Sequence, residues 1–157
     1  MGDPRRLKKT YQTPFRAWDS KRIEKENAIL EKYGLRRKKE IWKAENILRE
    51  IRSQAKELQS TRDPLMTKQL MDKVNRLNLV GEKATLDDIL SLNLENILDR
   101  RLQTIMVTKG LARTPHQARQ FITHGHVIVG DRKIVWPSFL VPKELEAQLQ
   151  IKKVKVN

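Results

Sequence analysis

The sequence predicts an α+β protein that is mostly α-helical with a small β element. Within 38–58, apolar residues recur at alternating intervals of three and four on a charged background, as in an amphipathic helix. Two further helical patterns, at 94–108 and 115–124, are separated by a short turn that contains Gly110. From His126 the pattern changes to short β-branched runs around a turn, which indicates a hairpin.

Composition limits both the size of the core and the class of partner. A chain of 157 residues holds one ordinary domain, or one compact module with a helical extension. Its apolar fraction of 38% predicts a modest core. Its net charge of +14 is self-repulsive unless an anionic partner neutralises it, and nucleic acid and anionic membranes are the usual partners of that kind.

The positive charge is concentrated in two regions. Residues 1–60 carry 17 Lys and Arg against 9 Asp and Glu, and residues 91–157 carry 11 against 5, whereas residues 61–90 carry 5 of each. Two basic regions therefore flank a neutral one.

Residues 1–19 predict an extended basic arm. They contain Pro4 and Pro14 and have no apolar period that could bury one face. The basic residues of the arm are Arg5, Arg6, Lys8, Lys9 and Arg16. We expect this arm to become ordered only on a partner.

Three longer helices are expected in a helical lobe that spans residues 20–95. The first covers about 20–33, and Gly34 suits the left-handed position that ends a helix. The second covers about 38–58 and carries the narrow apolar face described above. The third begins at Asp63-Pro64, an N-cap followed by a proline in the first helical position.

Residues 96–157 predict a second unit with a helix pair and a hairpin. Asn93 can cap the helix at 94–108, and Thr114-Pro115 can cap and open the next one. The apolar face of the first helix leaves four polar residues largely outside: Arg100, Arg101, Gln103 and Thr104. Val127–Val129 and Ile134–Trp136 are the two hairpin strands, Ser138–Val141 is a short extended piece, and Val154 and Val156 alternate as in an edge strand.

Catalytic motifs are missing from the sequence. There is no cysteine, which excludes disulfides, thiolate zinc sites and a cysteine nucleophile. Glycine-rich nucleotide loops, a GxSxG elbow and an HExxH pair are also absent, and most carboxylates stand beside Lys or Arg. We therefore predict that the protein is not an enzyme and holds no cofactor.

Membrane attachment is not expected. No apolar run approaches the roughly 20 residues that a spanning helix needs, and no apolar stretch follows the basic start as it would in a signal peptide. Arg6 occupies the position where a myristoylation motif requires Ser or Thr.

His124 and His126 have three possible roles. Two imidazoles could bind a metal, but zinc takes four ligands and the neighbouring sequence supplies no third. They could be surface or capping residues. They could also donate hydrogen bonds to phosphate or base edges, and their place after a basic helix favours this last role.

The basic residues converge on one part of the predicted fold. The run Arg36, Arg37, Lys38 and Lys39 taken alone could be a solvated face or a localisation patch. However, further basic residues fall on the ends or outer faces of the helix pair and in the hairpin turn: Arg101, Lys109, Arg113, His116, Arg119, His124, Arg132 and Lys133. This convergence favours RNA, because arginine both pairs with phosphate and stacks on bases.

Two details refine the expected mode of binding. The N–H groups of 114–117 at the helix start offer a phosphate site. Gln117 and Gln120 are the only amides on that helix, so base readout in a DNA major groove is disfavoured. Aromatic residues make up 5% of the chain, and Trp136 and Phe139 could be core residues or stacking residues.

The segment Leu98 to Val141, "LDRRLQTIMVTKGLARTPHQARQFITHGHVIVGDRKIVWPSFLV", resembles the S-four-type RNA-binding module. That family has RRL near its start, an EAR- or QAR-like helix, I-x-H-G-x-V, a glycine-containing hairpin turn and a late Pro-Ser. One departure is the turn, which reads Val-Gly-Asp where many members have Val-Asn-Gly.

The rest of the chain resembles the archaeal and eukaryotic branch of the family of small-subunit ribosomal protein number four. The resemblance rests on "MGDPRR", "Y-x-TPF-x-AW", "RIEKEN", "EKYGLRRKKEIWKAE" and "LNLENILDRRLQT". It implies direct binding to small-subunit rRNA, nucleation of subunit-body assembly, and an influence on decoding accuracy together with ribosomal protein number five. Some bacterial members carry a zinc-binding cysteine knuckle that this chain lacks, so no metal is expected.

From the residues and the resemblance together, we predict a structural rRNA-binding protein of the cytoplasmic small ribosomal subunit that forms no homo-oligomer. The expected RNA contacts are Arg5, Arg6, Lys8, Lys9, Arg16, Arg36, Arg37, Lys38, Lys39, Arg101, Lys109, Arg113, Thr114, His116, Arg119, Gln120, His124, Arg132 and Lys133. The rivals are an RNA-modifying enzyme, for which no residues remain to build a catalytic domain, and a non-ribosomal RNA chaperone that uses the same module.

Overall fold

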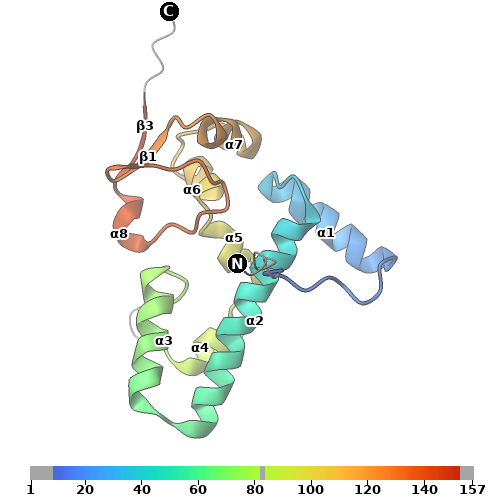
Figure 1. The fold of residues 1–157 in the computed structure, drawn as a ribbon, viewed down its shortest axis with the longest axis vertical. Helices are drawn as coiled ribbons and strands as arrows, with labels where there is room; N and C mark the ends of the chain where they lie inside the picture. Colours follow the sequence, from blue (N-terminus) through green and yellow to red (C-terminus); the bar gives the residue numbers. More distant parts are fainter. Residues whose placement is uncertain (1–8, 82–83, 153–157) are drawn as a thin grey trace, which may run out of the picture.

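The computed structural model describes residues 9–81 and 84–152. The elements in chain order are α1 (Ser20–Tyr33), α2 (Lys38–Thr61), α3 (Pro64–Arg76), α4 (Leu86–Ser91), α5 (Leu94–Asp99), α6 (Leu102–Thr108), α7 (Pro115–Thr123), β1 (Val127–Val129), β2 (Arg132–Lys133), α8 (Lys143–Glu146) and β3 (Leu149–Ile151) (Figure 1). The predicted α+β class is confirmed. Arg5, Arg6 and Lys8, together with Val154 and Val156, lie outside the described residues.

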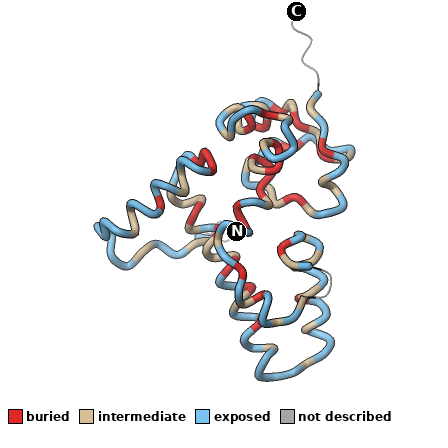
Figure 2. The backbone as a smooth tube through the Cα atoms, turned by 180° about the vertical axis from the view of Figure 1, so that it is seen from behind, coloured by how far each residue is buried: buried red, intermediate tan, exposed pale blue. Residues whose placement is uncertain are grey.

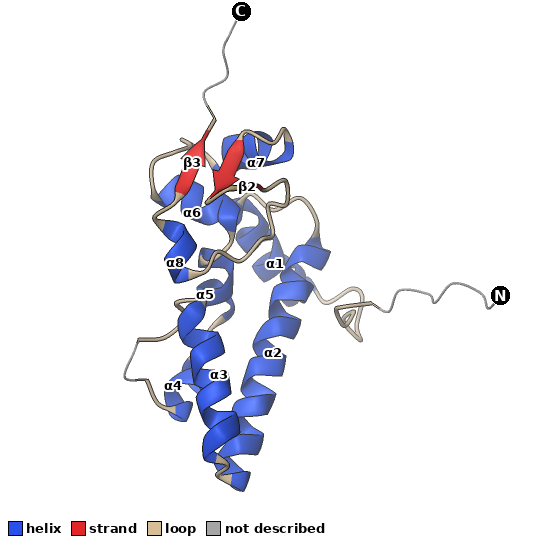
Figure 3. Cartoon of the chain, turned by 60° about the vertical axis from the view of Figure 1, so that its left-hand side comes forward, coloured by secondary structure: helices blue, strands red, loops and turns tan. Residues whose placement is uncertain are grey.

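Helix α2 organises the helical part of the chain. Its predicted apolar face is confirmed, because its buried residues are Ile41, Ala44, Leu48, Ile51 and Ala55. Helices α1, α3, α4 and α5 all contact it, and α3 runs back alongside it (Figure 3). A single long amphipathic helix thus supplies the surface against which the shorter helices bury their apolar faces.

Local capping signals set most helix ends where the sequence predicts them. Gly34 ends α1 in the left-handed conformation with a φ of 59°. The Asp63 side chain caps α3 by accepting a hydrogen bond from the Leu65 N–H at 3.0 Å, and Pro64 occupies the first turn. Thr114 and Pro115 begin α7 in the same way.

The single helix expected at 94–108 is wrong, because the chain forms α5 and α6 with a break at Arg100 and Arg101. Arg101 is extended, with a φ of −71° and a ψ of 142°, and forms an isolated antiparallel bridge with Leu140. The Leu102 N–H donates to the Phe139 carbonyl at 2.8 Å. Pairing with the distant 138–141 segment therefore replaces the helical hydrogen bonds at this point.

A three-stranded antiparallel sheet with the order β2-β1-β3 follows the helix pair. The third strand is Leu149–Ile151, whose Leu149 pairs with Val129 and whose Ile151 pairs with Val127. Strand β2 is Arg132–Lys133, so these two residues are not in the hairpin turn as expected, and Ile134–Trp136, expected as the second strand, is not a strand. Helix α8 is an element that the sequence did not predict.

The hairpin turn explains the departure from the family's turn sequence. Val129 pairs with Arg132, so Gly130 and Asp131 are the two central residues. Gly130 has a φ of 61°, and Asp131 is not among the residues of positive φ. A left-handed residue in the first position only is the pattern of a type II′ turn, which takes glycine there, whereas Asn-Gly suits a type I′ turn.

The buried residues form two apolar clusters (Figure 2). The first runs from Tyr33 to Leu98 and lies around α2, and the second runs from Leu102 to Leu149 and lies among α6, α7 and the sheet. The chain passes from one to the other at the break between α5 and α6. The division into units of 20–95 and 96–157 stays a prediction. None of the described helices is both long and apolar enough to cross a membrane.

We predict that Ile51→Ala lowers the free energy of unfolding by about 3 kcal/mol, because Ile51 is only 1% exposed and its loss leaves a cavity beside α2. The matched control Leu65→Ala removes a side chain that is 62% exposed, so its effect should stay below about 0.5 kcal/mol. Urea denaturation of the two variants measures both values. Equal losses would contradict this placement of the core.

Candidate nucleic-acid interface

The exposed side of α7 gathers several of the predicted RNA contacts. His116, Gln120 and His124 are exposed and follow one another at intervals of four residues, which places them on one face of the helix. Arg113 is exposed just before the helix, and its N–H donates to the Gln117 Oε1 at 2.9 Å. Polar and cationic side chains thus line the whole length of α7.

The capping of α7 corrects one sequence-based expectation. The Thr114 hydroxyl accepts a hydrogen bond from the Gln117 N–H at 3.2 Å. That N–H was predicted to be free for phosphate, and this prediction is wrong because the cap occupies it. Thr114 is therefore a cap, although it remains exposed at the helix start.

The hairpin extends this surface beyond the end of α7. Gly125 is left-handed with a φ of 72°, and the Lys133 side chain lies so close to it that a Cβ would collide with the Lys133 amine, 2.6 Å away. The rings of His124 and His126 stack with centroids 6.3 Å apart. Arg132 and Lys133 are both exposed. We call the surface formed by Arg113, His116, Gln120, His124, Arg132 and Lys133 the α7 face.

The start of α2 lies beside the start of α7. A Cβ at Gly34 would lie 2.6 Å from the Pro115 Cβ and 3.2 Å from the Gln103 Nε2, so only glycine allows this close approach. Arg36 and Arg37 follow directly and are exposed. The structure therefore brings part of the predicted basic run next to the α7 face, although the two are about 80 residues apart in sequence.

Glu40 joins α2 to the start of α6 and to α7 through two arginines. Its carboxylate accepts a hydrogen bond from the Arg101 Nη2 at 2.5 Å and from the Arg119 Nη2 at 3.1 Å. The Arg101 side chain is only 5% exposed and that of Arg119 is 24% exposed. The expectation that Arg101 lies on an outer face is wrong, and Arg119 is engaged inside the protein.

The electrostatics of this cluster keep Glu40 ionised. Burial raises the pKa of Glu40, but hydrogen bonds and charges from Arg119 and Arg101 outweigh it, so the pKa lies below its ordinary value. Burial lowers the pKa of Arg101, and the bond to Glu40 offsets part of that effect. The group is therefore an internal ion-paired triad, because Glu40 compensates the desolvation of both arginines and they compensate that of Glu40.

Gln103 is a second buried connection, which links α6 to the end of α1 and the start of α7. Its Nε2 lies 3.2 Å from the Tyr33 carbonyl oxygen, 3.0 Å from that of Gly34 and 3.0 Å from that of Pro115. Gln103 was expected outside and is 1% exposed. The apolar face of α6 is buried as expected, and its polar side is covered as well, because Arg101 and Gln103 face the junction of α1, α2 and α7. Arg100 is also engaged, in an ion pair with Glu146 at 2.7 Å.

Comparison with known proteins agrees with this geometry. Residues 100–146 match the S4 domain. Small ribosomal subunit protein uS4 of Picrophilus torridus is 52% identical over 152 residues, which is 93% of this chain and 83% of that protein. The chain belongs to the uS4 family. The uS4 protein of Methanococcus aeolicus is 55% identical over 146 residues, 90% of this chain and 82% of its own length, and that of Thermoplasma acidophilum is 52% identical over 147 residues, 90% and 74% respectively.

Membership of the uS4 family confirms the resemblance drawn from the sequence. The match to the S4 domain begins at Arg100 and so covers α6, α7 and the hairpin, the elements that carry the α7 face. Helix α2 with Glu40 lies outside the matched residues, within the region shared with the uS4 relatives.

The described part of the arm is attached to the helices of this uS4 chain. The Tyr11 and Trp42 rings lie with centroids 6.0 Å apart, and the Arg22 Nη2 donates to the carbonyl oxygens of Arg16 and Ala17 at 2.9 Å each. These contacts attach 9–19 to α1 and α2, and ordering of the arm on a partner stays a prediction. Lys9 and Arg16, both predicted contacts, are exposed within it.

The remaining predicted contacts are spread over the surface. Lys38 lies 3.3 Å from the buried Glu26 carboxylate, and the Lys109 amine donates to the Glu146 carbonyl oxygen. Lys39 lines a cavity of about 260 Å³ between α2 and the loop that carries Pro137. The other lining residues are Glu40, Lys43, Ala44, Ile47, Ile97, Arg101, Arg119, Ser138 and Leu140.

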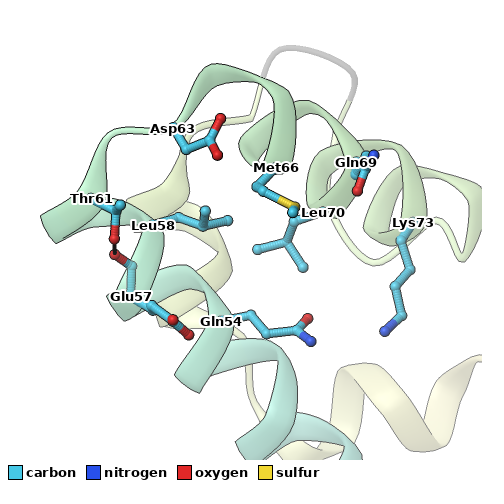
Figure 4. Close-up of a pocket in the computed structure, with 9 residues that line it drawn as sticks. All are labelled: Gln54, Glu57, Leu58, Thr61, Asp63, Met66, Gln69, Leu70 and Lys73. Atoms are coloured by element: carbon cyan, nitrogen blue, oxygen red, sulfur yellow. Dashed lines mark hydrogen bonds between the residues drawn. The ribbon is translucent and has the colours of Figure 1, made fainter.

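A larger groove lies between α2 and α3, away from the predicted contacts (Figure 4). It has a volume of about 470 Å³, and Leu58, Met66 and Leu70 group along it. Its charged residues are Glu57, Asp63 and Lys73, so their net charge is negative. None of the predicted RNA contacts lines this groove, and its charge does not suit a polyanion.

Glu40 and Glu26 were not predicted as positioning residues. The available signal was Glu40's place directly after four cations, at the start of an amphipathic helix. An acid in that position can neutralise cations that the fold brings in from elsewhere. Only the fold shows that those cations are Arg101 and Arg119.

We predict that Glu40→Gln lowers the free energy of unfolding at pH 7 by about 3 kcal/mol, because two partly or fully buried guanidinium groups lose their counter-charge. The folded pKa of Glu40 lies below its ordinary value of 4.5. The stabilisation is therefore complete above pH 4.5 and is lost as the pH falls through the folded pKa.

Urea denaturation of both proteins as a function of pH tests this. The difference between them should shrink as the pH falls below 4.5. The control Glu57→Gln changes an exposed carboxylate of the same helix and should stay within about 0.5 kcal/mol of the parent. A difference that is constant with pH would show that Glu40 contributes through packing and not through charge.

Proposed function

We propose that this protein is a structural component of the small ribosomal subunit that binds small-subunit rRNA directly. The observation that carries the proposal is the α7 face, an exposed group of cationic and polar side chains on the S4-type module of a uS4-family chain. The names of its relatives support a ribosomal role. On this proposal the protein acts on the cytoplasmic ribosome and is not an enzyme.

The geometry favours recognition of phosphates and RNA shape. The α7 face presents a single amide, Gln120, and its other members are cationic or imidazole side chains. Such groups bind phosphate and 2′-hydroxyl oxygens without reading base sequence in a deep groove. Arg36 and Arg37 extend the positive surface on the side where α2 begins.

The predicted contacts divide into two groups by their surroundings. Those of the α7 face, with Arg36 and Arg37, are free to reach RNA directly. Arg101 acts as a positioning residue, because its guanidinium is buried against Glu40. Arg119 combines both roles, since one side of it pairs with Glu40 and about a quarter of its side chain remains exposed.

The finer elements of the proposed function follow from the family resemblance. We include nucleation of subunit-body assembly, contact with ribosomal protein number five and a contribution to translational accuracy. We expect neither membrane attachment nor homo-oligomers, and neither metal nor cofactor.

The alternative function is that of a non-ribosomal RNA chaperone that uses the same module. The groove between α2 and α3 favours the ribosomal role, because a second surface with apolar residues and a net negative charge suits a protein neighbour in a larger particle. Sedimentation of cell lysates separates the two. If the protein is present in small subunits in stoichiometric amount, the proposal is supported, and if it is found only on free RNA, the proposal is refuted.

We predict that Arg113→Ala weakens binding to in vitro transcribed small-subunit rRNA about tenfold. The slope of log affinity against log salt should also fall in magnitude by about 0.7 to 0.9, because one phosphate contact is lost. Arg113 is exposed, so the thermal unfolding of the variant should match that of the parent. Filter binding at several salt concentrations measures both quantities.

Lys68→Ala on α3 is the matched control, since Lys68 is an equally charged, exposed residue away from the α7 face. It should change neither the affinity nor the slope. If the parent protein itself binds with an affinity that does not vary with salt, the phosphate account is refuted.

A further inference from the structure

Two aromatic side chains project almost fully into solvent from the described part of the arm. Phe15 is 102% exposed and Trp18 is 92% exposed, more than any other large apolar residue among those described. Aromatic side chains normally bury a large area in a folded protein. Their exposure is therefore unusual and indicates that they contact something outside the chain.

The backbone that carries these two residues is held in place. Arg22 donates hydrogen bonds of 2.9 Å to the carbonyl oxygens of Arg16 and Ala17, the two residues between Phe15 and Trp18. The same guanidinium forms an ion pair of 2.6 Å with Glu26. Since Arg22 of α1 thus holds the backbone of this turn, the aromatic side chains of Phe15 and Trp18 face away from the helices.

Trp42 provides a second attachment. Its Nε1 donates to the Glu26 Oε1 at 3.0 Å, and its ring packs against Tyr11. Glu26 is only 4% exposed. One buried carboxylate therefore organises both attachments of the arm, and burial raises its pKa less than the bonds from Trp42, Arg22 and Lys38 lower it.

The charge around the two aromatic residues is positive. Arg16 lies between them in sequence, and Lys9, Lys21 and Lys25 are exposed nearby along the chain. Of the neighbouring acids, Asp19 caps α1, where it accepts from the Arg22 N–H, and Glu24 is exposed on α1, so four cations stand against two acids. Exposed aromatic faces among cations are the pattern of sites for single-stranded nucleic acid, in which bases stack and phosphates pair with the cations.

We propose that Phe15 and Trp18 form a stacking platform for unpaired bases of RNA, and that Arg16 and Lys21 contact the adjoining phosphates. This inference rests on the proposed function and adds a second mode of binding to it. The α7 face recognises phosphates and shape, whereas the platform takes bases that protrude from the helical parts of the RNA. An apolar protein partner fits the platform less well, because it would leave the surrounding cations without counter-charges.

The test uses the full chain and two probes, in vitro transcribed small-subunit rRNA and an unstructured 15-nucleotide RNA, the latter chosen as about one site size. The double variant Phe15→Ala/Trp18→Ala should bind both probes at least tenfold more weakly, since base stacking contributes about 1–3 kcal/mol per base. Its salt slope should equal that of the parent, because no phosphate contact is removed. Arg16→Ala should instead reduce the slope.

Two matched variants separate stacking from apolar contact and from folding. Phe15→Leu/Trp18→Leu keeps most of the apolar area but has no aromatic face, so it should lose most of the same affinity. Leu65→Ala/Met66→Ala removes exposed apolar side chains elsewhere and should bind as the parent does. All of these variants change exposed side chains, so their thermal unfolding should match that of the parent.

Fluorescence gives an independent measurement. In a Trp136→Phe background, the 15-nucleotide RNA should quench the emission of Trp18, and further replacement Trp18→Phe should abolish the RNA-dependent change. Trp42 supplies the unchanged background, since it is half-buried and hydrogen-bonded to Glu26.

The outcomes distinguish this inference from the proposed function. If the parent binds rRNA with a steep salt dependence and the double alanine variant binds equally well, the platform is refuted and the proposed function stands. If that variant binds RNA normally but fails to enter small subunits, a protein is the partner and the platform is also refuted. If the parent binds neither probe, the proposed function itself fails.

Discussion

The ion pairs of Glu40 with Arg101 and Arg119 are the interaction on which the arrangement of the charged surfaces depends. In a chain with a net charge of +14, two guanidinium groups brought together at one junction would repel each other. Glu40 removes that cost and turns the repulsion into a connection between α2, the start of α6, and α7. Because Arg101 is buried, the loss of this carboxylate leaves an uncompensated charge where water cannot solvate it. The position of Arg36 and Arg37 beside α7 follows from the same junction.

Glu26 has an equivalent role for the arm. It receives Arg22, Lys38 and the Trp42 N–H, and through Arg22 it fixes the backbone between Phe15 and Trp18. Both carboxylates are largely withdrawn from solvent and lie where separate parts of the chain meet. The acids at these junctions bind internal cations, whereas other cations, such as Arg36 and Arg113, are exposed at the surface. This separation explains how a strongly basic chain is both folded and attractive to a polyanion.

Structural features that depend on residues close in sequence were predicted correctly, and features that depend on residues far apart in sequence were not. The apolar face of α2 and the helix ends at Gly34 and Asp63 depend on neighbouring residues, so their patterns are visible in the sequence. The break at Arg101 depends on pairing with Leu140, some 40 residues away, and no local pattern encodes it. The predicted exposure of Arg101 and Gln103 was wrong for the same reason, because the residues that cover them, Glu40 and Gly34, are more than 60 residues away in sequence. The helical part of the α7 face was predictable because helical spacing alone places His116, Gln120 and His124 on one side.

The two proposed RNA-binding surfaces are attached to the same end of one helix. Glu40 and Trp42 are both in the first turns of α2, and through them the α7 face and the platform at Phe15 and Trp18 are connected to one scaffold. When two sites are rigidly linked, binding at the first raises the effective concentration at the second only for a ligand that matches their separation. Neither phosphate contacts nor base stacking depends strongly on the sequence of the RNA. Their fixed separation nevertheless selects RNAs that present a structured backbone and unpaired bases at that distance, so specificity arises from the shape of the scaffold.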